Sequence, residues 1–310
     1  MVKKFIEKSI ENNFSHVFLV VNPLNVIVTK LIIDQFGLKS NEVLIVTFRN
    51  VKTSLLDYKT IHTKNRKFDG IMRKIFFLNP NAKTILNNID DKFILYASWA
   101  FREVNYLLKS SKCGGHIYIE EGQGSYINNE KFDYSKLSLY TKIKNHFKNR
   151  INNEKGPKYT FRSDTNGFIA LYPESFPSIE AKNKFFLKNF KSLKKIYKPR
   201  TIGIKNIALT CAERRLLNND WEAMLLKLIK TLPNGGLIKL HPSFFVSEEK
   251  IDKIKFFLAH KTNDLVKLCS NDIILELEML FEKKTFYGPQ TSLLFYAKHF
   301  GSNFVSINLY

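Results

Sequence analysis

The fold class of this chain is indicated most clearly by the stretch His16-Val17-Phe18-Leu19-Val20-Val21, which is followed by Asn22-Pro23-Leu24-Asn25. A continuous apolar run rich in β-branched residues is typical of a strand buried on both faces. The turn at Asn22-Pro23 ends that strand, and helical apolar spacing over 26–36 follows it. Strands that alternate with helices in this way indicate a parallel α/β sheet.

The same alternation continues along the chain on both sides of a basic, proline-broken middle segment. Further strands are predicted over 43–48, 92–97, 116–119, 206–210, 237–240, 285–287 and 303–307, helices through Val104 and Leu107 and over 221–232, 248–258, 273–281 and 293–299, and a mixed segment over 68–77. We therefore predict an N-terminal domain over 1–165, a connector over 166–200 and a C-terminal domain over 201–310. Both domains are expected to be Rossmann-like, and the two are expected to face each other across a cleft.

Composition limits the function less sharply than the strand pattern does. The 310 residues carry a net charge of +21, which suits nucleic acid, an anionic membrane surface or an anionic small substrate. Three widely spaced cysteines without a Cys-x-x-Cys motif argue against a zinc site or a disulfide framework and fit a reducing cytoplasm. No apolar run reaches ~18 residues, and a charge comes too early for a signal peptide, so we expect no spanning segment.

Glu120-Glu121-Gly122 directly follows the strand predicted over 116–119. Neighbouring residues on an extended chain point in opposite directions, so one carboxylate can face a ligand while the other turns inward. A glutamate at this place could take a proton from a hydroxyl group. The alternative is an acidic surface turn that caps the next helix.

His241-Pro242 follows the strand predicted over 237–240. A histidine at a strand end can donate a proton or a hydrogen bond to a departing phosphate near neutral pH, and proline suits the first turn of a helix. The alternative is a histidine that is satisfied by a backbone carbonyl group.

Gly288-Pro289-Gln290-Thr291-Ser292 precedes the helix predicted over 293–299. Hydroxyl and free amide groups at a helix start can bind an anion, although Thr291 or Ser292 could equally be an ordinary helix cap. The sequence has no metal-ligand spacing such as His-Glu-x-x-His or Asp-x-Asp and no Gly-rich phosphate loop. We therefore expect no metal and no cofactor, with protein groups neutralising any phosphate that leaves.

Together these motifs resemble those of bacterial sialyltransferases. The segment Ile119-Glu120-Glu121-Gly122-Gln123-Gly124-Ser125-Tyr126 looks like their acidic-acidic-Gly motif, Lys239-Leu240-His241-Pro242 their His-Pro motif, and Gly288 to Phe295 their paired-hydroxyl motif. The opening turn Asn22-Pro23-Leu24-Asn25 is similar to the Thr-Pro-Leu-Gln turn that begins the lipooligosaccharide sialyltransferases. Thr291 stands for the usual first serine, and Asn22 and Asn25 stand for Thr and Gln.

The resemblance implies a GT-B fold and metal-independent, inverting transfer from CMP-sialic acid. It makes Glu120, with Glu121 close behind, the general base and His241 the group that assists the leaving phosphate. It places residues at the donor phosphate (Gln290, Thr291, Ser292 and Pro242), at the ribose or base (Glu276, with Glu278 as competitor, and Thr210) and on a loop near donor and acceptor (Asn22, Pro23 and Leu24).

The leading hypothesis is therefore a sialyltransferase that acts on lipooligosaccharide or capsule. Its expected partners are a CMP-sugar, a lipid-linked glycan and an anionic membrane, with no nucleic acid; a homodimer stays open. The expected location is the cytoplasm, at the inner face of the bacterial inner membrane. A transferase of Kdo, legionaminic or pseudaminic acid is the close alternative. A basic nucleic-acid-binding protein and an inactive glycan-binding relative are the others.

Overall fold

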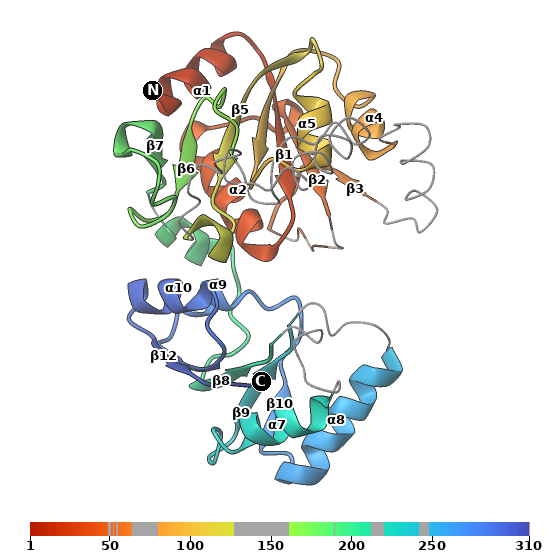
Figure 1. Ribbon diagram of the computed structural model, residues 1–310, viewed down its shortest axis with the longest axis vertical. Helices are drawn as coiled ribbons and strands as arrows, with labels where there is room; N and C mark the ends of the chain where they lie inside the picture. Colours follow the sequence, from red (N-terminus) through yellow and green to blue (C-terminus); the bar gives the residue numbers. More distant parts are fainter. Residues whose placement is uncertain are drawn as a thin grey trace, which may run out of the picture. The chain divides into compact units, whose positions relative to one another are not determined.

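The computed structural model describes residues 1–48, 51, 53, 55–63, 80–126, 161–188, 190–211, 220–241 and 248–309. The chain forms two compact units, Met1–Asn189 and Phe190–Tyr310, and each is described by itself (Figure 1). The segment 68–77, for which the sequence predicts mixed structure, lies outside the described residues, as does the stretch from 127 to 160.

The first unit contains a parallel sheet of seven described strands. Their order across the sheet is β3 (Lys59–His62), β2 (Val43–Thr47), β1 (Ser15–Val20), β4 (Phe93–Ala97), β5 (Cys113–Ile119), β6 (Phe168–Ala170) and β7 (Lys184–Phe186). Its helices are α1 (Val2–Glu11), α2 (Pro23–Phe36), α4 (Pro80–Leu86) and α5 (Arg102–Leu107), with short 3₁₀ turns η1 (Ser40–Glu42), η2 (Gln123–Ser125) and η4 (Ala181–Asn183).

In the first unit, the apolar strands β1, β2 and β4 are buried on both faces. On one face α4 and α5 pack with Ile85, Val104 and Leu107 against side chains of β1, β2 and β4. The alternate strand residues, among them Phe18 and Tyr96, are also fully buried. This two-sided burial is the reason why these strands read as continuous apolar runs.

The helix predicted over 26–36 begins three residues earlier, at Pro23, because the predicted turn itself forms the first turn of α2. Asn22 is the N-cap, and its side-chain oxygen accepts a hydrogen bond from the backbone N–H of Asn25 at 3.0 Å. Pro23 occupies the first turn, where its missing N–H is not needed. The helix ends at Gly37, whose φ of 62° is a left-handed conformation that glycine adopts without strain.

The second unit contains a parallel sheet of five described strands. Their order is β10 (Val266–Leu268), β9 (Gly236–Lys239), β8 (Asn206–Leu209), β11 (Thr285–Gly288) and β12 (Asn303–Ser306). The helices are α7 (Trp221–Ile229), α8 (Glu248–Thr262), α9 (Leu275–Glu278) and α10 (Leu293–His299), and the 3₁₀ helix η5 (Phe190–Lys195) opens the unit. Side chains of α7 and α8, including Leu225, Leu228 and Leu258, form a core with Ala208 and Ile238 of the sheet.

The boundary between the units differs from the predicted connector over 166–200. Residues 168–170 and 184–186 are strands β6 and β7 of the first sheet, and the division falls after Asn189. These strands have three residues each, so they give no apolar run that a sequence pattern could reveal. No helix among the described ranges is long and apolar enough to cross a bilayer.

Candidate functional site

Three adjacent strands of the first sheet, β1, β4 and β5, end beside one another. Asn25 connects the segments that follow them: its side-chain oxygen accepts from the N–H of Val21 and from the hydroxyl of Ser98, both at 3.1 Å. Its amide nitrogen donates to the carbonyl oxygen of Glu120 at 3.0 Å. Asn25 is fully buried, so these bonds hold the carboxyl edge of the sheet in one arrangement.

Glu120 points into the unit and is fully buried. Its Oε1 accepts from the hydroxyl of Tyr126 at 2.7 Å, and its Oε2 accepts from the N–H of Leu171 at 2.7 Å and the hydroxyl of Ser175 at 2.6 Å. Hydrogen bonds to a carboxylate are short and strong, and three of them fix this side chain. Glu120 therefore braces the loop that carries the motif.

Glu121, by contrast, is half-buried, as alternation along an extended chain requires. The Asn22 amide nitrogen donates to the carbonyl oxygen of Glu121 at 2.7 Å and to its carboxylate at 3.2 Å. Asn22 thus caps α2 with its oxygen and holds Glu121 with its nitrogen. Of the other residues in this turn, Pro23 is exposed and Leu24 is buried.

The chain turns sharply after Glu121. Gly122 has a φ of 114°, a conformation that a residue with a side chain rarely adopts. The turn brings the buried hydroxyl of Ser125 to 3.0 Å from the N–H of Glu121, which donates to it. The motif Glu120 to Tyr126 is therefore self-braced, and its tyrosine is the residue that binds Glu120.

In the second unit, β9, β8 and β11 are likewise adjacent, and three predicted site segments follow them. The backbone N–H of His241, after β9, donates to the buried hydroxyl of Thr210, after β8, at 2.7 Å. His241 itself is exposed. Thr210 therefore supports the turn that presents His241, and Pro242 lies outside the described residues.

The predicted hydroxyl pair follows β11, at the same edge of the second sheet. Gly288 packs so tightly that a Cβ there would lie 2.8 Å from the carbonyl oxygen of Leu209. Thr291 and Ser292 are both half-buried, and Gln290 is exposed. Ser292 is the N-cap of α10, but its side chain makes no capping hydrogen bond, so its hydroxyl is not consumed by the cap.

Glu276 lies in the first turn of α9 and is partly exposed. Burial raises the pKa of this carboxyl group, and its backbone N–H and the charge of Lys239 oppose that shift. The Lys239 ammonium donates to the carbonyl oxygens of Ser270 at 2.7 Å and Ile273 at 3.0 Å. The lysine therefore holds the loop before α9 in place while its charge acts on Glu276.

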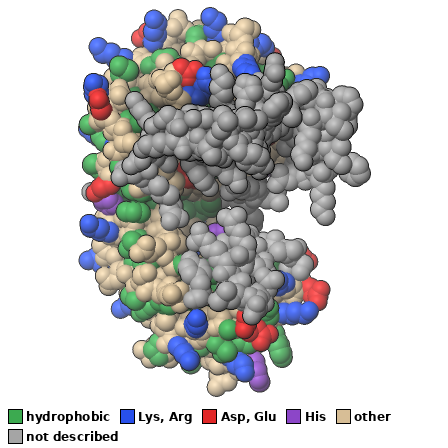
Figure 2. Space-filling model, in the orientation of Figure 1, with side chains coloured by type: hydrophobic (Ala, Val, Ile, Leu, Met, Phe, Trp, Pro, Cys, Tyr) green, Lys and Arg blue, Asp and Glu red, His purple; other side chains and the backbone are tan. Residues whose placement is uncertain are grey.

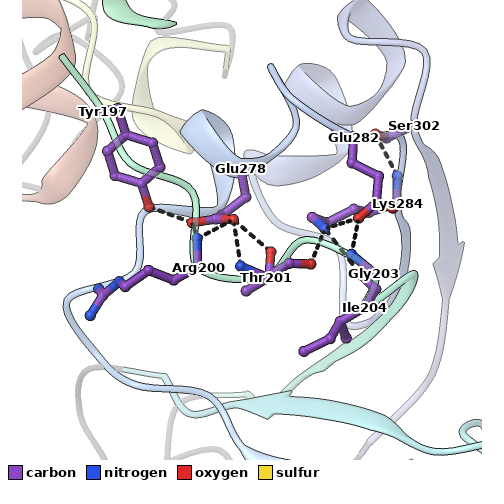
Figure 3. A network of polar contacts seen from close by, with 9 residues as sticks. All are labelled: Tyr197, Arg200, Thr201, Gly203, Ile204, Glu278, Glu282, Lys284 and Ser302. Carbon is purple, nitrogen blue, oxygen red and sulfur yellow. Dashed lines mark hydrogen bonds and ion pairs between the residues drawn. The ribbon is translucent and has the colours of Figure 1, made fainter. Parts of the chain in front are cut away.

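Glu278, the competitor for the same role, is engaged inside the unit (Figure 3). Its carboxylate accepts from the hydroxyl of Tyr197 at 2.6 Å, from the N–H of Arg200 at 3.0 Å, and from the N–H and hydroxyl of Thr201 at 2.9 and 2.7 Å. Burial alone would raise its pKa, but these hydrogen bonds outweigh burial and lower it. Glu278 thus ties the chain over 197–201 to α9.

Lys284 extends this network on the other side of Thr201. Its fully buried ammonium donates to the carbonyl oxygens of Thr201 at 2.9 Å and Ile204 at 3.0 Å, and to Glu282 at 3.0 Å. A buried charge is tolerated only with such partners. Glu278 and Lys284 therefore both bind the segment 197–204, near the start of the second unit, and fix its backbone (Figure 3).

Two other histidines lack the exposure of His241. His16 and His116 are buried, and burial lowers the pKa of each to about 4. The Nδ1 of His16 lies 2.9 Å from the hydroxyl of Tyr96. Both rings are therefore neutral near pH 7 and belong to the interior of the first unit.

Three residues that organise the first edge have no signal in the sequence, namely Ser98, Leu171 and Ser175. Asn25 belongs to the opening turn noted in the sequence, but its contacts with Val21, Ser98 and Glu120 could not be predicted from it. Within the described part of the chain, no group of three or more His, Cys, Asp or Glu side chains is placed to hold a metal ion.

The fold can be compared with known proteins once these edges are defined. The sequence matches no family profile and no curated protein. Among solved structures, S. aureus MnaA in complex with UDP is similar with a TM-score of 0.53 and 12% identity over 95% of this chain and 79% of the other. A structure from Listeria monocytogenes assigned as a UDP-N-acetylglucosamine 2-epimerase is similar with a TM-score of 0.50 and 10% identity over 95% and 79%. These likenesses concern the fold alone, and they show that the two parallel α/β units have the GT-B fold.

Proposed function

We propose that this chain is an inverting sialyltransferase that moves sialic acid from CMP-sialic acid to a hydroxyl group of a cell-surface glycan. The observation that carries the proposal is the pairing of Asn22 with the half-buried Glu121 at the carboxyl edge of the first sheet. In open α/β sheets this edge is where ligands bind. His241 and Thr291 lie at the corresponding edge of the second sheet, which supports the same reading.

Glu121 is proposed as the general base. It removes the proton of the acceptor hydroxyl as that oxygen attacks the anomeric carbon, and the bond from that carbon to the CMP phosphate oxygen breaks. The family resemblance favours Glu120 as the base, with Glu121 close behind. We propose Glu121 instead, because both oxygens of Glu120 already accept hydrogen bonds inside the unit. Glu120 would then act as a positioning residue.

The leaving CMP phosphate is proposed to bind at the second edge. His241 would donate a proton or a hydrogen bond to it, and Thr291, Ser292 and Gln290 would donate further hydrogen bonds. The exposure of His241 and the absence of a capping bond from Ser292 support these roles. Groups of this kind can neutralise a departing phosphate without a metal ion, so metal independence is part of the proposal.

For the nucleoside, Glu276 is proposed to bind the ribose hydroxyl groups. It is partly exposed, whereas the Glu278 carboxylate accepts four or more hydrogen bonds from the chain over 197–201. Thr210 is proposed to contribute through the backbone of His241 rather than through the cytosine ring. The acceptor is proposed to be a lipid-linked glycan at the cytoplasmic face of the membrane.

A donor panel tests this proposal. The protein is incubated in EDTA with CMP-sialic acid, CMP-Kdo, UDP-N-acetylglucosamine and a lipooligosaccharide acceptor, and release of each nucleotide is followed. We expect CMP release from CMP-sialic acid that depends on acceptor and is lost in Glu121→Gln. Turnover of CMP-Kdo alone would establish the alternative donor, and turnover of the UDP-sugar alone would refute the proposal.

A further inference from the structure

The entry into the second unit has an unusual charge distribution. Between Glu180 and Glu213 the sequence contains nine Lys or Arg residues and no acidic residue. Figure 2 shows Lys and Arg side chains on the surfaces of both units, together with acidic ones. The run is distinguished by its sequence, which carries no acidic residue of its own. Within the second unit it provides Lys194, Lys195 and Lys198, which are all exposed and have no ion pair with a carboxylate in the described part of the chain.

Two apolar side chains are exposed within the same segment. Ile196 is 45% exposed and Ile202 is 58% exposed. Ile196 follows η5, whose Leu193 is fully buried and anchors the helix to the unit. Ile202 lies in the turn closed by the hydrogen bond from the N–H of Ile204 to the carbonyl oxygen of Thr201, at 3.0 Å. Each isoleucine is therefore presented by an anchored turn.

The network of Figure 3 holds the backbone of this segment at Arg200, Thr201 and Gly203. One carboxylate, that of Glu278, binds both Tyr197 and Thr201, which directly adjoin Ile196 and Ile202. Glu282 accepts from the N–H of Gly203 at 3.0 Å. Glu278 and Glu282 thus bind the backbone of this segment, and Asp272 pairs with the Arg200 guanidinium at 3.0 Å. Lys194, Lys195, Lys198 and the two isoleucines stay exposed.

We propose that this segment docks on an anionic phospholipid bilayer through a docking surface made of the exposed side chains of Lys194, Lys195, Ile196, Lys198 and Ile202. Lysines near such a surface bind lipid phosphates, and exposed aliphatic side chains enter the headgroup region. A short braced segment loses little conformational freedom on binding. The inference concerns where the protein meets the membrane and does not depend on the proposed reaction.

The apolar part of the surface favours a bilayer over single-stranded nucleic acid. Proteins that bind single strands present aromatic rings on which bases stack. The exposed apolar side chains here are isoleucines, and the hydroxyl of the neighbouring Tyr197 is bound to Glu278. Aliphatic side chains have no base-stacking role but do partition into lipid.

Sedimentation of the full chain with vesicles tests the proposal. Vesicles contain phosphatidylcholine and phosphatidylglycerol at roughly three to one, or phosphatidylcholine alone. We expect binding to the anionic vesicles only, weakened by added salt. The variant Lys194→Glu/Lys195→Glu/Lys198→Glu should bind on the order of a hundredfold more weakly, because each lysine near the surface contributes about fivefold. The variant Ile196→Ser/Ile202→Ser should bind about tenfold more weakly.

Matched controls come from exposed residues elsewhere in the second unit. Lys227→Glu/Lys230→Glu/Lys267→Glu changes the net charge equally, and Leu226→Ser/Leu265→Ser removes two comparably exposed apolar side chains. Both controls should bind within about threefold of the wild type, because they leave the lysines and isoleucines of the docking surface in place. Lys194→Gln/Lys195→Gln/Lys198→Gln provides a milder variant, and unchanged melting temperatures show that each variant is folded.

Equal losses of vesicle binding in the controls and in the docking-surface variants would overturn the proposal. The proposal would also be overturned if the wild type did not bind anionic vesicles but bound a DNA oligonucleotide through the same lysines.

Discussion

Asn22 donates from its amide nitrogen to the carbonyl oxygen of Glu121 at 2.7 Å and to the Glu121 carboxylate at 3.2 Å, across 99 residues of sequence. The same side chain caps α2 through its oxygen. The first turn of the chain therefore positions the acidic motif that follows β5. In the proposed reaction this contact sets the orientation of the base.

The two roles of Asn22 can be separated by substitution. Serine is as good an N-cap as asparagine, so Asn22→Ser should leave the free energy of unfolding within about 0.5 kcal/mol of the wild type. It removes the amide that holds Glu121, and we expect kcat to fall about tenfold. Asn22→Ala loses both roles and should cost about 1 kcal/mol in addition. Thermal unfolding and transfer kinetics on the same samples provide the check, and wild-type kcat in Asn22→Ser would show that the contact has no part in turnover.

Glu121 and Glu120 should respond differently to conversion to glutamine. Glu121→Gln should lower kcat by about a thousandfold, as loss of a general base does, with CMP affinity and melting temperature unchanged. Glu120→Gln replaces a buried carboxylate that accepts three hydrogen bonds, so we expect a loss of about 2 kcal/mol in unfolding free energy. The reverse pattern, with full stability in Glu120→Gln and full activity in Glu121→Gln, would return the base to Glu120.

The hydroxyl of Thr210 is proposed to act only through His241. Thr210→Val keeps the shape of the side chain but leaves the N–H of His241 without its acceptor. We expect activity to fall about tenfold, and His241→Ala to lower it by about a hundredfold or more. In the double variant the effects should not add, because the threonine acts through the histidine. Additive losses in this cycle would show instead that Thr210 contacts the substrate.

Glu278 gives a pH-dependent contribution to the stability of the second unit. Its hydrogen bonds lower its pKa below the ordinary value of 4.5, so the unfolded chain binds its proton at higher pH than the folded chain does. The stabilisation is therefore complete above about pH 4.5 and is lost as the pH falls through the lower folded pKa. Glu278→Gln should destabilise the unit by about 3 kcal/mol at pH 7 and by less at pH 3. Urea unfolding at both pH values measures this, and an equal loss at each would contradict it.

Because of His16, the stability of the first unit should also depend on pH, in a range above that of Glu278. Burial lowers its pKa from 6.5 to about 4, so the unfolded chain takes up a proton between these values that the folded chain does not. Stability should fall by roughly 3 kcal/mol as the pH drops from 6.5 to 4, with His116 adding a similar amount. His16→Leu should be less stable at pH 7, since Tyr96 loses its partner, but should show a shallower decline on acidification. Parallel curves for wild type and variant would contradict this account.

The parts of the fold that depend on local pattern could be predicted from the sequence. The apolar run at 16–21 predicts β1, and the helical spacing over 26–36 predicts α2 except for its first turn. The helix predicted over 293–299 has the bounds of α10. Strand β3 (Lys59–His62) was missed, because its four residues are exposed or half-exposed and carry no apolar run. The connector was placed too early for the same reason, since β6 and β7 contribute three residues each.

The candidate site was predictable in its position but not in its contacts. The strand ends placed Glu120 and Glu121 at a sheet edge, and alternation required that they point in opposite directions. Which one points inward is decided by Leu171 and Ser175, more than fifty residues later in the chain. The partners of Glu278 lie 77 and 81 residues before it, at Thr201 and Tyr197. Such contacts depend on the assembled unit and have no local signature.

Whether the edge of the second sheet binds a cytidine nucleotide can be decided by a melting-temperature screen of CMP, CDP, UDP and dTDP in EDTA, with wild type and Thr291→Val/Ser292→Ala side by side. We expect CMP or CDP to raise the wild-type melting temperature, the double variant to lose most of this shift, and UDP and dTDP to do much less. A wild type stabilised by UDP and unaffected by CMP would contradict this expectation.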